Sequence, residues 1–237
     1  MSSNNYGIRY INNERYQHDL VPGSGTTPLV SGCLQKEWID QYTPDPKVIF
    51  IVGSCDGGDE IKLHSWFPQA TIYSFEAIKE NYDLAVSNIA HLNTDKIHVY
   101  HYAVFDIDGE IEFNHSIWPK GDHEGSFYLQ DITHRQINNI QSVKIKVPCI
   151  TLKTFCEQNN IDNIDVIQID VEGAGYEVIQ GMQEIKPTMI CIEVQAPRSF
   201  QDGNHQPAEE DELITLIVEK GYIYVSQLPH DYLFVKN

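Results

Sequence analysis

Acidic side chains stand directly after two apolar runs of this chain. Glu76 follows TIYSF, while Asp170 and Glu172 leave the end of VIQI, just before a stretch with helical character. Carboxylates at strand ends accept hydrogen bonds from a ribose, take a proton from a hydroxyl, or bind a divalent cation. We predict that Asp170 and Glu172 face a ligand crevice. The alternative is that one of them caps the following helix.

A glycine-containing turn follows the apolar run VIFIV in VIFIVGSCDGGDE. Gly53 and Gly57 give the spacing GxxxG, which differs from the GxGxxG of a dinucleotide-binding turn, and no P-loop lysine follows. Glu76 comes after Gly53 at about the 20-residue spacing expected of a ribose-binding acid. Together they indicate an adenosine ligand, with an ordinary strand–helix turn as the alternative.

These residues need a parallel sheet to bring them together, and the rest of the pattern predicts one. Short apolar runs alternate with amphipathic stretches, which is typical of a doubly wound, mostly parallel α/β domain. The predicted strands are 47–52, 70–75, 97–105, 111–114, 143–150, 166–170 and 189–194, followed by a terminal hairpin of 222–226 and 232–235. A tight turn at 106–110 is predicted to join 97–105 and 111–114 in a hairpin. We expect an irregular N-terminal extension (1–46), with a short helix in 34–42, and a single domain (47–237). Residues 115–142 are predicted to form a long irregular loop.

Composition limits the class of protein. The 237 residues are 41% hydrophobic, enough for one sizeable core, and the net charge of −18 argues against nucleic acid or anionic membranes as partners. This balance favours small neutral or carbohydrate-like ligands, with solubility alone as the alternative explanation. Five cysteines without a CxxC pair argue against a disulfide framework or a structural zinc site. Without an apolar signal or membrane segment, we expect a cytoplasmic protein.

Five segments resemble one family in their order along the chain. FIVGSCDGGDE, YSFEAIKENYDLAVSN, VPCITLKTF, IDVIQIDVEGAGYEVIQGM and PTMICIEVQ resemble the FkbM-type class I methyltransferases over about residues 47–195. These enzymes use S-adenosylmethionine (SAM). The resemblance implies a Rossmann-like seven-stranded sheet with a C-terminal antiparallel strand, and O-methylation of a hydroxyl on a sugar, a glycan or another small metabolite.

The resemblance also assigns roles to residues. It implies that the cofactor site comprises Gly53, Ser54, Asp56 and Gly57 around the methionine end, Glu76 and Ala77 at the ribose, and Ala103 near the adenine. It places Asp170, Glu172 and Glu193 beside the transferred methyl group as catalytic acids, with a divalent metal as an alternative partner for them. Asn81 and Asn88 are expected to pack helices.

Two further points remain open at this stage. Ile51 and Cys55 stand where the family usually has an acid and an asparagine, so a non-catalytic module that binds SAM or a nucleotide is the alternative to an enzyme. In the 115–142 segment, His115 and His123 are candidate general bases. In the same segment, Ser126, Trp118, Phe127 and Tyr128 either shape an acceptor pocket or, as the favoured alternative, anchor the loop by hydrophobic contacts. The sequence does not indicate the acceptor or the oligomeric state.

Overall fold

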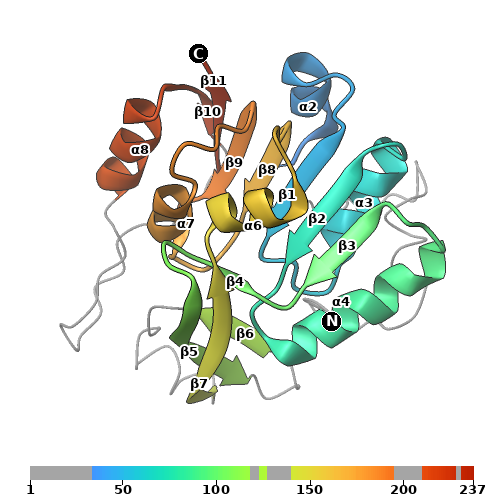
Figure 1. Cartoon of the computed structure of the whole chain (residues 1–237), viewed down its shortest axis with the longest axis vertical. Coiled ribbons are helices and arrows are strands. Elements are labelled where there is room, and N and C mark those ends of the chain that lie inside the picture. Colours follow the sequence, from blue (N-terminus) through green and yellow to red (C-terminus); the bar gives the residue numbers. More distant parts are fainter. Residues whose placement is uncertain (1–33, 118–122, 127–139, 195–209, 228–230) are drawn as a thin grey trace, which may run out of the picture.

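A seven-stranded, mostly parallel sheet forms the centre of the computed structural model (Figure 1). The structure describes residues 34–117, 123–126, 140–194, 210–227 and 231–237. The strands of this sheet are β1 (Val48–Val52), β2 (Thr71–Phe75), β3 (Ile97–Tyr100), β8 (Val166–Ile169), β9 (Met189–Glu193), β10 (Tyr222–Gln227) and β11 (Asp231–Lys236). Their order is β10-β11-β9-β8-β1-β2-β3, and β11 runs antiparallel to both of its neighbours. The predicted doubly wound fold with a reversed C-terminal strand is confirmed.

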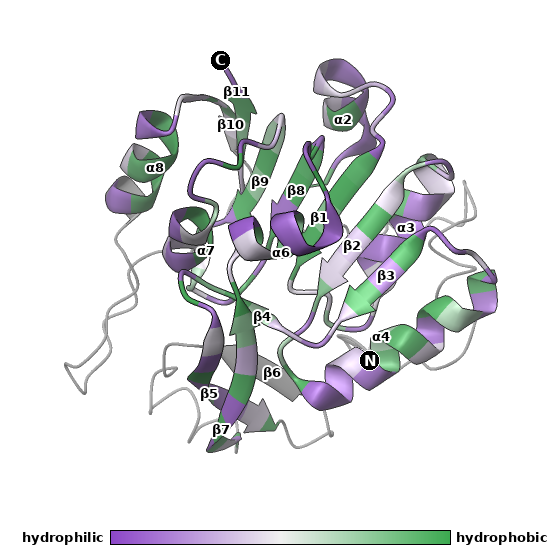
Figure 2. Cartoon of the chain, viewed as in Figure 1, coloured by the Kyte–Doolittle hydropathy of each residue, from purple (hydrophilic) through white to green (hydrophobic). Residues whose placement is uncertain are grey.

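Helices cover both faces of this sheet. They are α2 (Lys36–Tyr42), α3 (Gly58–Trp66), α4 (Lys79–Ile89), the 3-10 turn η1 (Ala90–Leu92), α6 (Leu152–Asn159), α7 (Gly175–Gly181) and α8 (Glu210–Glu219). The central strands are largely hydrophobic, whereas the helices mix hydrophilic and hydrophobic residues (Figure 2). This arrangement buries the strands on two sides, as their near-continuous apolar runs require.

Strand β1 shows how the two faces are built, because successive side chains point to opposite sides of a strand. Ile49 and Ile51 lie in one core cluster with residues of α2 and α3. Phe50 and Val52 lie in the other, with residues of α6, α7 and α8. All four are at most 1% exposed, so β1 is buried on both faces of the sheet.

A second sheet lies at the carboxyl ends of the parallel strands (Figure 1). It consists of β4 (Ala103–Val104), β5 (Gly109–Ile117), β6 (His123–Ser126) and β7 (Gln141–Ile150), in the order β4-β7-β5-β6. The chain enters it directly from β3, because Ala103 and Val104 pair with Cys149 and Ile150 of β7 instead of continuing the main sheet. The predicted single strand 97–105 is therefore wrong: it is split between two sheets.

The predicted irregular loop 115–142 is also partly wrong. Strand β5 continues to Ile117, pairs with β7 down to Gln141, and carries β6 on its other edge. Cross-strand pairing extends the ladder through residues whose polar sequence gives no strand pattern. His115 is buried in β5, and residues 123–126 form β6. Trp118, Phe127 and Tyr128 lie outside the described residues.

The segment before β1 contributes to the core. The predicted helix within 34–42 is confirmed as α2, and Leu34 and Ile39 are buried against the face that α3 covers. Residues 1–33 lie outside the described residues, so the boundary at 46/47 stays a prediction.

Cys55, Cys149, Cys156 and Cys191 are free thiols. In the part of the chain that the structure describes, no helix is long and apolar enough to cross a membrane.

The last residue of α7 lies against the chain that follows β4. A Cβ atom added to Gly181 would lie 2.1 Å from the backbone oxygen of Phe105. We predict that Gly181→Ala lowers the free energy of unfolding by about 1–3 kcal/mol, because a backbone atom cannot move aside as a flexible side chain can. Urea unfolding measures this loss.

Gln180→Ala is the matched control, since Gln180 is exposed one position earlier in the same helix. Alanine has a higher helix propensity than glycine by about 1 kcal/mol, so propensity alone predicts the opposite sign at position 181. A Gly181→Ala protein that is as stable as the wild type would contradict the close packing of α7 on this segment.

Candidate active site

The turn after β1 is held between the two strands that flank β1. The backbone N–H groups of Gly53 and Ser54 both donate to the Phe75 carbonyl at the end of β2, each at 3.0 Å. On the other side, Asp170 N–H donates to the Val52 carbonyl at 2.9 Å. Gly53 has φ +96°, and a Cβ atom there would lie 1.8 Å from the Asp170 carbonyl oxygen. Only glycine fits this position, for both reasons.

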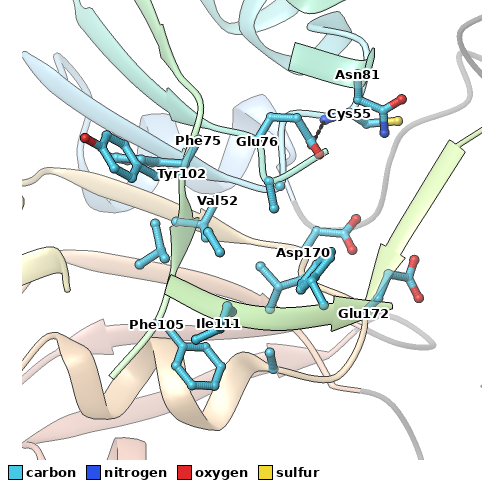
Figure 3. A pocket seen from close by; sticks show the side chains of 17 residues that line it. Val52, Cys55, Phe75, Glu76, Asn81, Tyr102, Phe105, Ile111, Asp170 and Glu172 are labelled. Carbon is cyan, nitrogen blue, oxygen red and sulfur yellow. Dashed lines mark hydrogen bonds between the residues drawn. The ribbon is translucent and has the colours of Figure 1, made fainter. Parts of the chain in front are cut away.

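A cavity of about 190 Å³ opens beside this turn (Figure 3). Its walls come from the ends of β1, β2 and β8 and from the second sheet. The residues that line it are Val52, Gly53, Cys55, Phe75, Glu76, Ala77, Asn81, Tyr102, Ala103, Val104, Phe105, Ile111, Phe113, Asp170, Val171, Glu172 and Ala174. The titratable side chains among them are acids, a thiol and a phenol. No Lys, Arg or His occurs in this set, which is drawn from the described residues.

Glu76 forms part of the wall and also fastens the glycine turn. One of its carboxylate oxygens accepts from Cys55 N–H and the other from Ile78 N–H, each at 2.8 Å. Burial raises the pKa of Glu76 to about 7, against the lowering effect of these backbone hydrogen bonds. Each carboxylate oxygen has a second lone pair, so Glu76 can accept further hydrogen bonds from a ligand in the cavity.

Asp170, Glu172 and Glu193 form an acidic cluster at the ends of β8 and β9. One carboxylate oxygen of each lies within 4.8 Å of the others. Burial raises the pKa of Asp170 well above its usual range, and the negative charges of Glu193 and Glu172 raise it further. Like charges at this distance disfavour simultaneous ionisation, so the cluster favours a bound proton or a cationic ligand.

The backbone of this segment argues against a capping role for these acids. The N-cap position of α7 is occupied by Ala174 and not by one of these acids, and the Ala174 side chain makes no capping hydrogen bond. Glu172 has φ +52°, a conformation that side-chain-bearing residues rarely adopt. Strained backbone of this kind clusters at functional sites, and here it directs Glu172 to the wall of the cavity.

The structure divides the predicted site residues into two groups. Gly53, Glu76, Ala77, Ala103, Asp170 and Glu172 line the cavity. Ser54, Asp56 and Gly57 do not. Ser54 Oγ is hydrogen-bonded to Glu60, at 2.5 Å, and the Asp56 carboxylate accepts from Gly58 N–H at 3.0 Å.

Glu193 is also absent from the cavity wall but belongs to the acidic cluster that borders it. Asn88 donates to the Asp56 carbonyl at 2.9 Å and so fastens α4 to the glycine turn, as a packing residue would. Asn81, which was expected to pack helices as well, lines the cavity.

Several cavity residues were not predicted. Cys55, Tyr102 and Phe105 lie in connecting segments, and Ile111 and Phe113 come from β5. The alternation GEIEFN, with apolar residues at 111 and 113, indicates a strand with one buried face. The pattern alone does not reveal that this face meets the end of the other sheet.

The two departures from the family pattern differ in their structural setting. Ile51 is fully buried among core residues of the α3 side and is not part of the cavity wall. Cys55 does line the cavity, has φ +53°, and binds Glu76 through its backbone N–H. Of these two side chains, only that of Cys55 is therefore placed to contact a ligand in the cavity.

Comparison with known proteins shows the family to which this chain is similar. The model of the methyltransferase FkbM domain matches residues 52–224. The 2-O-methyltransferase NoeI of Sinorhizobium fredii (strain NBRC 101917 / NGR234) is 30% identical over 149 residues, which are 60% of this chain and 59% of NoeI. The match thus spans less than two thirds of that relative.

Solved methyltransferase structures are also among the matches of this chain. The O-methyltransferase of a trans-AT polyketide synthase multienzyme of Brevibacillus brevis, in complex with S-adenosyl-L-homocysteine (SAH), has a TM-score of 0.47 and 12% identity. The match covers 80% of this chain and 51% of that one. The N-terminal domain of EvdMO1 with SAH bound has a TM-score of 0.47 and 10% identity, with 85% and 79% covered. Since the family model spans most of the chain, this protein belongs to the FkbM methyltransferase domain family.

Proposed function

We propose that this protein is a SAM-dependent methyltransferase that methylates a hydroxyl oxygen of a sugar, a glycan or another small metabolite. Membership of the FkbM methyltransferase family supports the reaction class. The name of its relative, a 2-O-methyltransferase, supports oxygen as the acceptor atom. A cavity without Lys or Arg among its described lining residues favours a neutral acceptor over a phosphorylated one.

The observation that carries this proposal is the placement of Glu76 and Asp170 around one cavity, at the ends of the strands on either side of β1. The lining residues fit SAM. Glu76 has free lone pairs for the two ribose hydroxyls, and Phe75, Tyr102 and Val104 offer apolar surface to the adenine. The acidic cluster at the other end suits the cationic part of the molecule.

SAM supplies a methyl group on a positively charged sulfur, which is an activated leaving group. The protein then has to align the acceptor hydroxyl with that methyl group and remove its proton. Asp170 is our candidate for the proton acceptor. Its raised pKa makes it a stronger base than an ordinary carboxylate once it is ionised. Positive charge in the cavity favours that ionised form.

A divalent cation is the alternative partner of the acidic cluster. Three carboxylate oxygens within 4.8 Å of one another are hard donors, which Mg²⁺ and Ca²⁺ prefer. In that case Asp170, Glu172 and Glu193 would hold the ion, and the ion would lower the pKa of the acceptor hydroxyl.

The first prediction for this function concerns Glu76. We predict that Glu76→Ala weakens binding of SAM and SAH by about tenfold to hundredfold, because charge-assisted hydrogen bonds to a ribose contribute roughly 1.5–3 kcal/mol. Isothermal titration calorimetry measures the affinity, and circular dichroism checks that the variant is folded.

Glu80→Ala is the control, because Glu80 is an exposed acid in the first turn of α4. It should bind SAH as the wild type does. Unchanged affinity in folded Glu76→Ala protein would contradict the ribose assignment. A wild-type protein that binds neither SAM nor SAH would contradict the proposed function itself.

The second prediction concerns Asp170. We predict that Asp170→Asn keeps the fold but lowers the rate of methyl transfer by about a hundredfold or more, because the amide cannot accept the hydroxyl proton. The measurement is product formation from SAM, followed by mass spectrometry against a panel of glycans and cell extracts. Exposed Asp162, changed to Asn, serves as the control.

The same assay separates the proton acceptor from a metal ligand. If Asp170 acts as the base alone, chelators and added Mg²⁺ leave the wild-type rate unchanged. If it holds a cation, chelators lower the wild-type rate, and the variant requires a higher Mg²⁺ concentration. Full activity of Asp170→Asn without any change in ion dependence would remove Asp170 from both roles.

A further inference from the structure

Glu60 is a buried acid directly behind the glycine turn. It belongs to the first turn of α3 and is 0% exposed. The hydroxyl groups of Ser54 and Ser74 both donate to its Oε1 atom, the former at 2.5 Å. Among the described residues, its Oε2 atom has no hydrogen-bond partner. Buried carboxyl groups without a cationic partner are costly, so this one needs an explanation.

The partners of Glu60 connect it to the cavity, although Glu60 itself does not line it. Ser54 stands between Gly53 and Cys55, which both form the wall, and Ser74 is followed by Phe75 and Glu76. The glycine turn is thus held by a carboxyl group on each side. Glu76 binds the backbone of Cys55 from the cavity side, and Glu60 binds the side chain of Ser54 from the core side.

The face of the sheet beneath α3 carries polar side chains that the acids of this helix bind. Ser74 and Gln168 are the register partners of Ile51 on its two neighbouring strands, so the three side chains form a row on one face. Glu60 binds Ser74 at one end of this row, and Asp59 accepts from Gln168 Nε2 at 3.0 Å at the other. Two successive acids of α3 therefore bind the polar side chains on either side of an apolar residue.

We propose that Glu60 is a positioning residue for the proposed methyl transfer: it holds Ser54 to Ser74 and thereby fixes the backbone of Gly53 and Cys55 that meets SAM. The inference rests on the proposed function. It adds a residue outside the cavity to the cofactor site.

The surroundings of Glu60 favour the neutral acid. Burial raises the pKa of Glu60 to about 8, and the hydrogen bonds from the two serines only partly oppose this. The titratable groups that interact with it are Asp59 on the same helix and the Cys55 thiol in the turn, both of which become negative on ionisation. The ammonium group of Lys62, two residues after Glu60, lies 3.8 Å from the Asp59 carboxylate and above the ring of Trp66. At neutral pH most Glu60 side chains therefore carry a proton.

The test compares the pH dependence of SAH binding in the wild type and in Glu60→Gln, by calorimetry between pH 6.5 and pH 9. The amide keeps the shape and the neutral state, so Glu60→Gln should bind SAH within about threefold of the wild type at pH 7. Burial disfavours the ionised form of Glu60 in this packed arrangement, so ionisation should loosen the turn as the pH rises. Roughly a tenth of the wild type has neutral Glu60 at pH 9, so its affinity should fall by up to about tenfold more than that of the variant. Glu76 and Asp170 are present in both proteins and cancel in this comparison.

Two further variants separate positioning from folding. Glu60→Ala should weaken SAH binding at every pH. Ser74→Ala, which removes one hydroxyl partner, should weaken it to a smaller extent, and this variant takes the place of Glu60→Ala if Glu60→Ala fails to fold. Exposed Glu80→Gln is the control and should follow the wild-type profile. Identical pH profiles of the wild type and Glu60→Gln would overturn the role of Glu60, as would wild-type affinity in folded Glu60→Ala. An absence of SAM and SAH binding in the wild type would instead overturn the proposed function.

Discussion

The contact between Gly53 and Asp170 determines how this site is assembled. The turn after β1 passes so close to the end of β8 that a Cβ atom at position 53 would lie 1.8 Å from the Asp170 carbonyl oxygen. The same turn donates two backbone hydrogen bonds to Phe75 at the end of β2. Three strand ends are therefore held together by backbone atoms alone. The ribose candidate Glu76 and the acid Asp170 lie on the cavity because the strands on either side of β1 end there.

Around this backbone arrangement, the site is built from acids that have little positive charge to balance them. Burial raises the pKa of Glu76 to about 7 and that of Glu60 to about 8, and burial with two neighbouring carboxylates raises the pKa of Asp170. The pKa of each of these carboxyl groups is thus higher than that of a surface acid, which favours the neutral form. Such a site favours a ligand that brings positive charge and hydroxyl donors, which matches the chemistry of SAM.

The second sheet gives the cavity its remaining wall. Strands β4 and β5 place Ala103, Ile111 and Phe113 opposite the ends of the parallel strands. This sheet begins where the chain leaves β3, and Gly181 of α7 packs against the backbone of Phe105, which follows β4. This wall of the cavity therefore depends on the packing between the two sheets, while the wall formed by Gly53, Glu76 and Asp170 depends on the main sheet.

The sequence by itself determined the main sheet, most of its strand positions and the acids at the strand ends. Strands such as VIFIV and VIQI are buried on both faces and are therefore largely apolar, and parallel strands bring their carboxyl ends to one edge of the sheet. The tertiary structure alone decided which of those residues reach the cavity. Ser54, Asp56 and Gly57 follow the same strand as Gly53 but line no part of the described cavity, and Asn81, Ile111 and Phe113 do. Glu60 was not singled out, because an acid in the first turn of a helix is usually exposed, and only the approach of Ser54 and Ser74 buries it. The physical reason is that strand periodicity is a local property, whereas side-chain contacts across loops and between sheets join residues far apart in the sequence.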